Sequence, residues 1–204
     1  IFIIGLIPNT THTISVSAQN SKNVNTLYGD EVSTSTLCVL PIAGVYTVNQ
    51  TSITASWLSG GNPSGTEYYC QRSTSSDFTL TADGGWATAI STNSESLTRN
   101  TTYYFRVKSR NNNFVETIGY VSLGSTVTLC EVPPVPSISN VYSSSITIKI
   151  NTGVNNSYWS KYSIKVTSGV SSTPQYVQAN GALNTAAIYQ TTAAWTNSIF
   201  IISE

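Results

Sequence analysis

Apolar and polar residues alternate in short runs through the middle of the chain, and turn-forming residues separate these runs. The runs Ile53–Trp57 and Tyr103–Val107 show the alternation most plainly, because every second residue is apolar. A period of two places successive side chains on opposite faces of a β-strand, so one face of each strand can be buried. Runs of this kind with a turn about every ten residues predict an antiparallel β-sandwich.

The stretch 42–133 contains enough runs for about seven short strands. Turn signals interrupt them at Leu58–Gly65 and at Asn111–Asn113, where Gly, Pro and Asn gather. In chain order, we expect strands at 44–48, at 53–57, at 68–72, as a weak pair around Asp83–Trp86, from 103 to the turn at 111, and at 120–129.

The chain also repeats itself with a period of about 92 residues, which is the length of a whole domain. The phrases Leu6–Asn20 and Leu97–Asn111 both run Leu, two residues, Asn-Thr-Thr, an aromatic residue or His, and then an alternating run that ends in Asn. Two further pairs of matching phrases lie at 35–38 and 127–130, which end in Leu-Cys, and at 53–57 and 146–150. The common period predicts tandem copies of one domain.

Proline marks the seams between the copies, at Leu40–Gly44 and at Val132–Pro136. Because proline cannot donate to a sheet ladder, both stretches should end strands. The second seam is rich in proline and is therefore expected to be semi-rigid.

Composition narrows the class of protein. Of the 204 residues, 40% are hydrophobic and only 9% are charged, and nine basic residues balance nine acidic ones. Zero net charge argues against nucleic acid binding, which needs a basic face, and against polybasic attraction to a membrane. No apolar run approaches the roughly 20 residues of a membrane helix, so no membrane span is predicted.

The apolar start, Ile1–Ile7, has two interpretations. It could be the apolar part of a signal peptide, or a strand that runs into the repeat register at Leu6. We favour the strand, because no basic residue and no Met precede it. Since the chain contains no Met, we expect it to be processed or to be a window cut from something longer.

At Ile53–Trp57, Tyr68 and Leu97–Tyr103, the sequence resembles a fibronectin type III domain. The resemblance spans the whole middle repeat and implies an all-β fold of tandem fibronectin type III-like, immunoglobulin-like antiparallel β-sandwiches. It implies that Trp57 is the core tryptophan of the second strand. It also implies that Tyr103 is a "tyrosine corner", whose hydroxyl ties down the crossover loop.

The outer repeats depart from this pattern at two positions. His12 stands at the corner in the first repeat, and Ile150 stands at the position of the core tryptophan in the third.

By the resemblance, residues 42–133 are a complete domain. Residues 1–41 match the C-terminal part of another domain (the end of strand E, then F and G), and residues 134–204 match the N-terminal part of a third (strands A to E).

Half a sandwich would expose a core face and open strand edges, which pair with whatever is near. Two explanations stay open. In the one we favour, the chain is a window from a long tandem protein. In the other, the terminal part of one copy completes the first part of the next, a head-to-tail contact that builds filaments when it does not close.

No pattern in the sequence points to catalysis or to a metal. His12 is the one histidine, and it has no Ser or Cys partner pattern near it. The acidic residues are mostly isolated in loops, without the spacing of a carboxylate pair. Gly29–Glu31 is the nearest thing to a calcium loop, but it carries too few oxygen ligands. We predict that the chain is not an enzyme and holds no cofactor or metal.

The three cysteines are predicted to form no disulfide within the chain. The resemblance implies that Cys70 lies on strand C and Cys130 at the end of strand G of the same sheet, with strand F between them. Two strand spacings are about 9.6 Å, which exceeds the roughly 7 Å limit for a disulfide. Cys38 and Cys130 lie a full domain apart. Cys70 faces inward and is expected to be a buried small hydrophobic residue. An interchain bridge through Cys38 or Cys130 stays open.

Sandwich domains usually bind partners through their end loops. The loop 109–118 carries Arg110, Phe114 and Glu116, a mixed set that suits contact with a protein. The Arg-Gly-Asp triplet of integrin ligands is absent from the sequence.

The remaining tryptophans could stack on sugars, but we expect core and strand packing instead. They are Trp86, Trp159 and Trp195. Four asparagines begin Asn-X-Ser/Thr sequons, which arise easily in a chain rich in Asn and Thr and are weak evidence for glycosylation. They are Asn9, Asn49, Asn100 and Asn155.

These observations predict a non-enzymatic structural protein, located outside the cell or on its surface, that forms part of a rod or filament. Phrases such as Asn62–Thr66 resemble tandem arrays on large bacterial surface proteins. The expected partners are copies of the chain or neighbouring domains of a longer one, with a cell-surface protein or glycan as a further candidate. Two alternatives stay open: an adhesin or carbohydrate-binding module, and an accessory segment of a large secreted enzyme.

Overall fold

The computed structural model describes residues 1–154, 156, 159–169, 173–195 and 199–203. Its strands pair antiparallel throughout, and the described residues contain no helix, so none that could cross a membrane. The predicted all-β antiparallel fold is confirmed. The chain divides into two compact units: unit 1 holds Ile1–Leu97 and Thr101–Thr128, and unit 2 holds Thr98–Asn100 and Leu129–Glu204.

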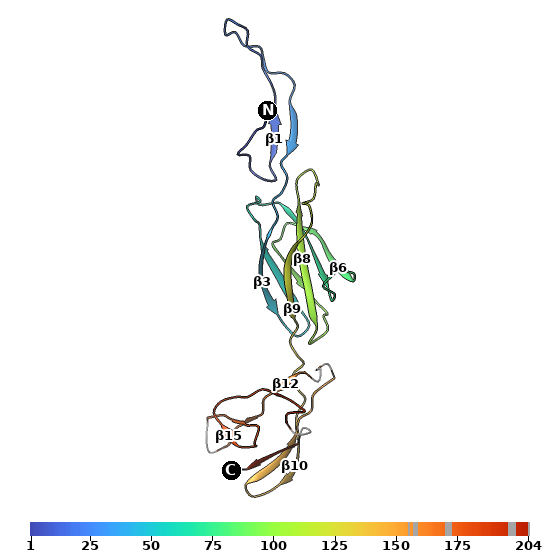
Figure 1. Ribbon diagram of the computed structural model, residues 1–204, viewed down its shortest axis with the longest axis vertical. Helices are drawn as coiled ribbons and strands as arrows, with labels where there is room; N and C mark the ends of the chain where they lie inside the picture. The colour runs from blue at the N-terminus through green and yellow to red at the C-terminus, as the bar shows by residue number, and fades with distance from the viewer. Residues whose placement is uncertain (155, 157–158, 170–172, 196–198, 204) are drawn as a thin grey trace. The chain divides into compact units, whose positions relative to one another are not determined.

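The middle repeat folds in unit 1 as a sandwich of two sheets (Figure 1). The first sheet has the order β3 (Ile42–Val48), β4 (Ile53–Leu58), β7 (Ser91–Ser94). The second sheet has the order β6 (Thr81–Ala87), β5 (Glu67–Ser73), β8 (Thr102–Arg110), β9 (Val121–Val127). The prediction of seven strands is confirmed.

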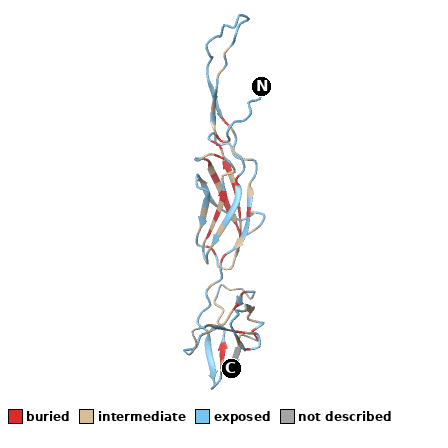
Figure 2. Cartoon of the chain, turned by 90° about the vertical axis from the view of Figure 1, so that its left-hand side faces the viewer, coloured by how far each residue is buried: buried red, intermediate tan, exposed pale blue. Residues whose placement is uncertain are grey.

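The core of this sandwich lies between the two sheets, where Figure 2 shows the buried residues. Alternate residues of β4 and β8 are buried, which confirms the inward faces that the apolar pattern predicts. Full burial of a large apolar side chain such as Phe105 contributes about 1.5–3 kcal/mol to folding. The core residues are Ile53, Ala55, Trp57, Tyr68, Cys70, Leu97, Tyr103, Phe105, Val107 and Leu123.

The first repeat contributes a hairpin, β1 (Thr11–Ile14) paired with β2 (Val32–Ser35), which also belongs to unit 1. The strands are joined by a long loop, within which Gln19 and Asn25 form an isolated bridge. The prediction of a strand at the apolar start of the chain is wrong. Residues 1–7 pair with no strand among the described residues and expose their side chains.

The repeated Asn-Thr-Thr phrase takes up the same local structure both times. Asn9 and Asn100 both adopt left-handed backbone conformations, with φ of 45° and 50°. The N–H of Asn9 donates to the carbonyl of Leu37 at 3.2 Å, and the N–H of Asn100 donates to the carbonyl of Leu129 at 3.2 Å. The sequence repeat is therefore also a structural repeat.

Unit 2 has smaller sheets. One has the order β10 (Ser137–Val141), β11 (Ser145–Lys149), β17 (Ile199–Ser203), which is the arrangement of β3, β4 and β7 in unit 1. Another pairs β12 (Lys161–Tyr162) with β16 (Gln190–Thr191). The last has the order β13 (Lys165–Val166), β14 (Gln175–Val177), β15 (Leu183–Asn184). The buried core residues are Ile148, Val177 and Trp195.

The structure differs from the expectation of a weak pair of strands around residues 83–86. Strand β6 runs straight through this stretch and pairs with β5 on both sides of a register shift. Gly85 has φ of +75°, a left-handed conformation that glycine adopts without strain. The two adjacent glycines make a bulge within one strand, rather than a turn between two.

Candidate functional site

The five residues predicted to be structural all lie in the core of the middle sandwich. Trp57 and Tyr68 come from β4 and β5, and their rings pack with centroids 5.9 Å apart. Tyr103 and Leu97 are buried near them. Burial raises the pKa of the Cys70 thiol to about 12, so this thiol stays protonated at neutral pH and is not a nucleophile.

The three residues of the predicted binding loop come together at the end of β8. Arg110 is the last residue of that strand, and its guanidinium carbon lies 4.8 Å from the centre of the Phe114 ring. The Arg110 Nε donates to Glu67 Oε2 at 2.6 Å. Glu116 forms an ion pair with Lys108. Phe114 remains 68% exposed, and it is the most accessible of the three.

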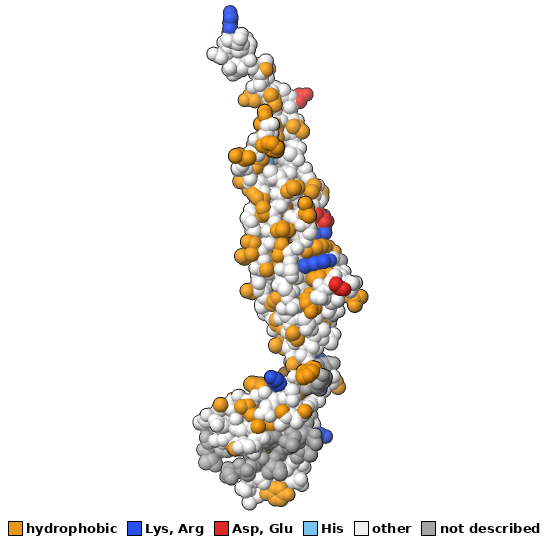
Figure 3. All heavy atoms as spheres, viewed as in Figure 1, with side chains coloured by type: hydrophobic (Ala, Val, Ile, Leu, Met, Phe, Trp, Pro, Cys, Tyr) orange, Lys and Arg blue, Asp and Glu red, His pale blue; other side chains and the backbone are white. Residues whose placement is uncertain are grey.

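A row of cations runs along the outer face of β8, at the alternate positions Arg106, Lys108 and Arg110. Each lies over aromatic rings that neighbouring segments supply. Figure 3 shows Lys and Arg side chains beside acidic ones over the middle sandwich. We call this row and its rings the cation–aromatic face; its rings are Tyr69, Phe78, Trp86, Phe114 and Tyr120.

Arg106 is the most enclosed member of the cation–aromatic face. Its guanidinium carbon lies 4.2 Å from the centre of the Phe78 ring and 4.1 Å from that of Tyr120. Its Nε also donates to Gln71 Oε1 at 2.7 Å. Partial burial lowers the pKa of Lys108, but its contacts with Glu116 and Tyr120 outweigh this effect, so the pKa is raised. The raised pKa keeps Lys108 charged at neutral pH.

Only the end of the cation–aromatic face was predicted from sequence. The sequence analysis did not identify Tyr69, Phe78, Trp86 and Tyr120 as members, because they come from separate segments that only the folded sheet brings together. The available signal was the spacing of Arg106, Lys108 and Arg110 at every second position of a predicted strand. Such spacing places three like charges in a line on one face of the strand, so side chains on the neighbouring strands are expected to pair with them.

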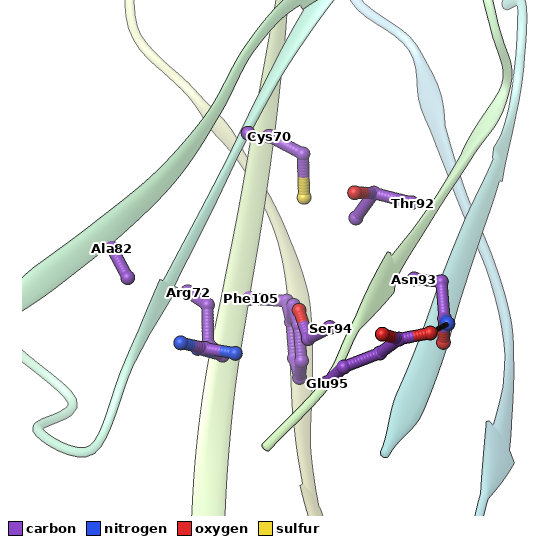
Figure 4. A pocket seen from close by; sticks show the side chains of 9 residues that line it. Cys70, Arg72, Ala82, Thr92, Asn93, Ser94, Glu95 and Phe105 are labelled. Atoms are coloured by element: carbon purple, nitrogen blue, oxygen red, sulfur yellow. Dashed lines mark hydrogen bonds between the residues drawn. The ribbon is translucent and has the colours of Figure 1, made fainter. Parts of the chain in front are cut away.

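A pocket of about 200 Å³ opens at the edge of the sandwich, between the two sheets (Figure 4). Its volume is below the roughly 300 Å³ of an ordinary small-molecule site. The protonated Cys70 thiol and the Arg72 side chain face it, and at its rim Asn93 Nδ2 donates to Glu95 Oε1 at 2.9 Å. This set lacks an acid–base pair. Among the residues that the structure describes, no group of three His, Cys, Asp or Glu could hold a metal.

The tryptophans divide between core and surface. Trp195 is fully buried in unit 2, and its Nε1 donates to the carbonyl of Tyr162 at 3.2 Å. Trp86 packs on Tyr69 in the cation–aromatic face. The expectation of core packing is wrong for Trp159, which is 70% exposed because it lies in a turn just before β12.

The cysteines and sequon asparagines have defined surroundings. Cys38, Cys70 and Cys130 are free thiols. The side-chain nitrogen of Asn9 donates to Thr66, that of Asn49 to Ser52, and that of Asn100 to Ser160. The fourth sequon asparagine, Asn155, lies outside the described residues.

Within unit 1, a seam of hydrogen bonds joins the first repeat to the middle sandwich. The Ser109 hydroxyl at the end of β8 donates to the carbonyl of Val39 at 3.0 Å. Asn111 Nδ2 donates to the carbonyls of Ser35 and Thr36, at 3.3 and 3.1 Å. The N–H of Asn112 donates to Asn9 Oδ1 at 2.7 Å. We call this set of contacts the first seam.

No family model matches the sequence, and no curated protein matches it. The chain is similar in fold to domains d3–d4 of the rat CD45 extracellular region, with 18% identity and a TM-score of 0.36 over 60% of this chain and 68% of that one. It is similar to the FN1–FN3 domains of chicken CNTN1, with 12% identity and a TM-score of 0.37 over 98% of this chain and 69% of that one. A β-1,2-glucanase from Parabacteroides distasonis matches with 14% identity and a TM-score of 0.36, over 53% of this chain and 16% of that one.

Proposed function

We propose that the chain is a non-enzymatic structural segment of an extracellular or cell-surface protein, in which the first repeat is fixed to the middle sandwich. The observation that carries this proposal is the first seam. Its side chains bond to the backbone of the preceding repeat, where a flexible linker would leave them in water.

The buried hydrogen bonds of the first seam favour a single position of the first repeat on the middle sandwich. Asn9, Ser109 and Asn111 are buried there, and a buried polar group destabilises a protein unless it is hydrogen-bonded. Any slippage between the first repeat and the sandwich would leave several of these groups without partners. A satisfied buried network therefore gives rigidity at the cost of adaptability. Such a joint suits a protein that spaces or connects other components.

The stiffness of the first seam can be measured by ¹⁵N relaxation on the intact chain. We expect backbone order parameters near 0.85 for residues 33–41, equal to those of β8 and typical of a rigid backbone. The variant Asn111→Ala should lower them towards 0.6, while Asn113→Ala, an exposed asparagine of the same loop, should leave them unchanged. Order parameters below 0.6 in the unmodified chain would overturn the proposal.

The cation–aromatic face supports an alternative function, which is binding of a surface protein or glycan. Phe114 at its end is exposed, and aromatic rings of this kind stack on sugars and on protein side chains. A glycan array with the intact chain tests this function. Binding that is lost in Phe114→Ala and kept in Val115→Ala, its neighbour in the loop, would favour it over a purely structural role.

One further observation bears on self-assembly. In the first repeat Ile14 and Val16 are exposed, whereas the equivalent residues of the middle repeat, Phe105 and Val107, are fully buried under the sheet that contains β4. We infer that a sheet of this type covers the first repeat, supplied by the preceding part of a longer chain or, in the case of self-assembly, by a second copy. Light scattering should then show a mass that rises with concentration, and Ile14→Ser should reduce the rise. A constant monomer mass excludes this assembly.

A further inference from the structure

Asn62 holds the main chain of one residue in the linker that precedes its sandwich. Its Oδ1 accepts from the N–H of Val39 at 2.9 Å, and its Nδ2 donates to the carbonyl of Val39 at 2.8 Å. The same Nδ2 donates to the carbonyl of Ser59 at 2.8 Å, which fixes the side chain on its own loop. The amide thus binds both polar groups of one residue, as a neighbouring strand would.

Asn156 makes the same two hydrogen bonds to a linker residue in unit 2, and a third to a carbonyl of its own loop, four residues before it instead of three. Its Oδ1 accepts from the N–H of Glu131 at 2.8 Å, and its Nδ2 donates to the carbonyl of Glu131 at 3.1 Å. The same Nδ2 donates to the carbonyl of Thr152 at 2.8 Å. Val39 and Glu131 occupy equivalent places, because each directly follows the cysteine of a Leu-Cys phrase.

A hydroxyl four residues after each asparagine provides a second point of attachment. Thr66 Oγ1 accepts from Asn9 Nδ2 at 2.8 Å, and Ser160 Oγ accepts from Asn100 Nδ2 at 3.4 Å. Asn9 and Asn100 are the equivalent asparagines that open the two Asn-Thr-Thr phrases. Thr66 and Ser160 are both buried.

Chance does not explain this agreement. The segments Asn62–Thr66 and 156–160 share only the asparagine and the final hydroxyl residue. The residues that they hold, Val39 and Glu131, differ in size, polarity and charge. Two unlike segments that make equivalent hydrogen bonds at equivalent places indicate a site defined by the two shared side chains.

We propose that the Asn-x-x-x-Thr/Ser pair is a recognition site for the end of the preceding repeat. The site binds two features of the preceding repeat. The first is the backbone N–H and carbonyl of the residue after Leu-Cys, and the second is the side chain of the asparagine that opens the Asn-Thr-Thr phrase. Because the contacts to Val39 and Glu131 involve main-chain atoms only, the site accepts either side chain. This inference deepens the proposed structural function, by naming the residues through which one repeat binds the next.

Amide hydrogen exchange on the intact chain tests the proposal at single residues. In Asn62→Ala, we expect exchange of the Val39 amide to accelerate about tenfold, as for loss of one hydrogen bond, and exchange of the Glu131 amide to stay unchanged. In Asn156→Ala, we expect the reverse. Equal protection of Val39 in the unmodified chain and in Asn62→Ala would overturn the proposal.

Two controls separate the site from general loss of structure. Amides of β5 and β8 report whether the sandwich is folded in each variant. Asn62→Asp keeps the acceptor for the Val39 N–H and removes the two donated bonds, so it should protect the Val39 amide better than Asn62→Ala does. If Asn62→Asp and Asn62→Ala exchange alike, the proposed geometry is wrong.

The exchange experiment and the relaxation experiment fail independently. Protected Val39 and Glu131 amides together with a mobile first seam would leave the recognition site intact and remove the proposed structural function. A rigid first seam with unprotected amides in both linkers would support the proposed structural function and overturn the recognition site.

Discussion

At the scale of the residue, Cys70 shows how burial decides chemistry. Its thiol lies in the core between the two sheets, next to the small pocket at the sandwich edge. Removal from water disfavours the thiolate, which is why the pKa rises to about 12. A cysteine in a pocket would suggest a nucleophile, but this one acts as a small apolar side chain.

The three thiols should therefore react in a fixed order. With a thiol-specific chromogenic reagent at pH 8, we expect the exposed Cys130 to react first and the half-buried Cys38 more slowly. Burial raises the pKa of Cys38 as well, although a hydrogen bond with Ser109 opposes this effect. Cys70 should react only after unfolding. Modification of Cys70 in the native chain at the rate of Cys130 would contradict its burial.

The raised pKa of Cys70 also predicts a loss of stability in alkali. The unfolded thiol loses its proton near the ordinary pKa of 9.0, while the folded thiol keeps it up to about 12. The stabilisation is thus complete below pH 9 and is lost as the pH rises from there, by at most about 1.4 kcal/mol per pH unit. Urea unfolding between pH 8 and pH 11 should show a smaller decline in Cys70→Ala. Equal declines would mean that other groups cause the effect.

At the scale of the element, the inner face of strand β8 can be predicted from the sequence, but the contacts of its outer face cannot. The inner face is apolar at every second residue, so its burial follows from the pattern. The outer face reads as an ordinary solvated face, because its partners on β5, β6 and the segments near β9 become neighbours only when the sheet forms. The sequence predicts two strands where β6 is one strand with a bulge, because paired glycines are typical of turns as well as of bulges.

The enclosed position of Arg106 predicts a stability effect for an outer-face residue. Arg106→Ala should lower the free energy of unfolding by about 1–3 kcal/mol, because it removes two ring contacts and a hydrogen bond. Arg106→Lys should recover only part of this, since an ammonium lacks the planar face that stacks on rings. Urea unfolding measures both. If Arg106→Ala changes stability no more than Lys22→Ala in the exposed first loop, the rings contribute nothing.

At the scale of the whole molecule, the sequence predicts the period of the repeat, but it does not predict the contacts that join the copies. Matching phrases predicted tandem domains, and Asn9 and Asn100 take up the same conformation in both. Their role in joining repeats was hidden, because asparagine in a chain rich in asparagine indicates turns or sequons first. The boundaries at 41/42 and 133/134 stay predictions.

The two units should respond separately to a core mutation. Trp195 is fully buried in unit 2, and truncation of a buried tryptophan costs about 3–5 kcal/mol. We expect Trp195→Ala to unfold unit 2 while the amide signals of β8 in unit 1 keep their native positions in an NMR spectrum. Simultaneous loss of the β8 signals would show that the units unfold as one.

The main-chain contacts of Asn62 and Asn156 bear on how such a protein changes over evolutionary time. An interface made of matched side chains ties each domain to one neighbour, because both surfaces must vary together. Here the residue that is held is Val in one linker and Glu in the other, and the bonds are the same. Duplication, deletion or reordering of repeats therefore leaves every new joint able to form. An array built on this site can change its length by recombination without a compensating mutation at the points of exchange.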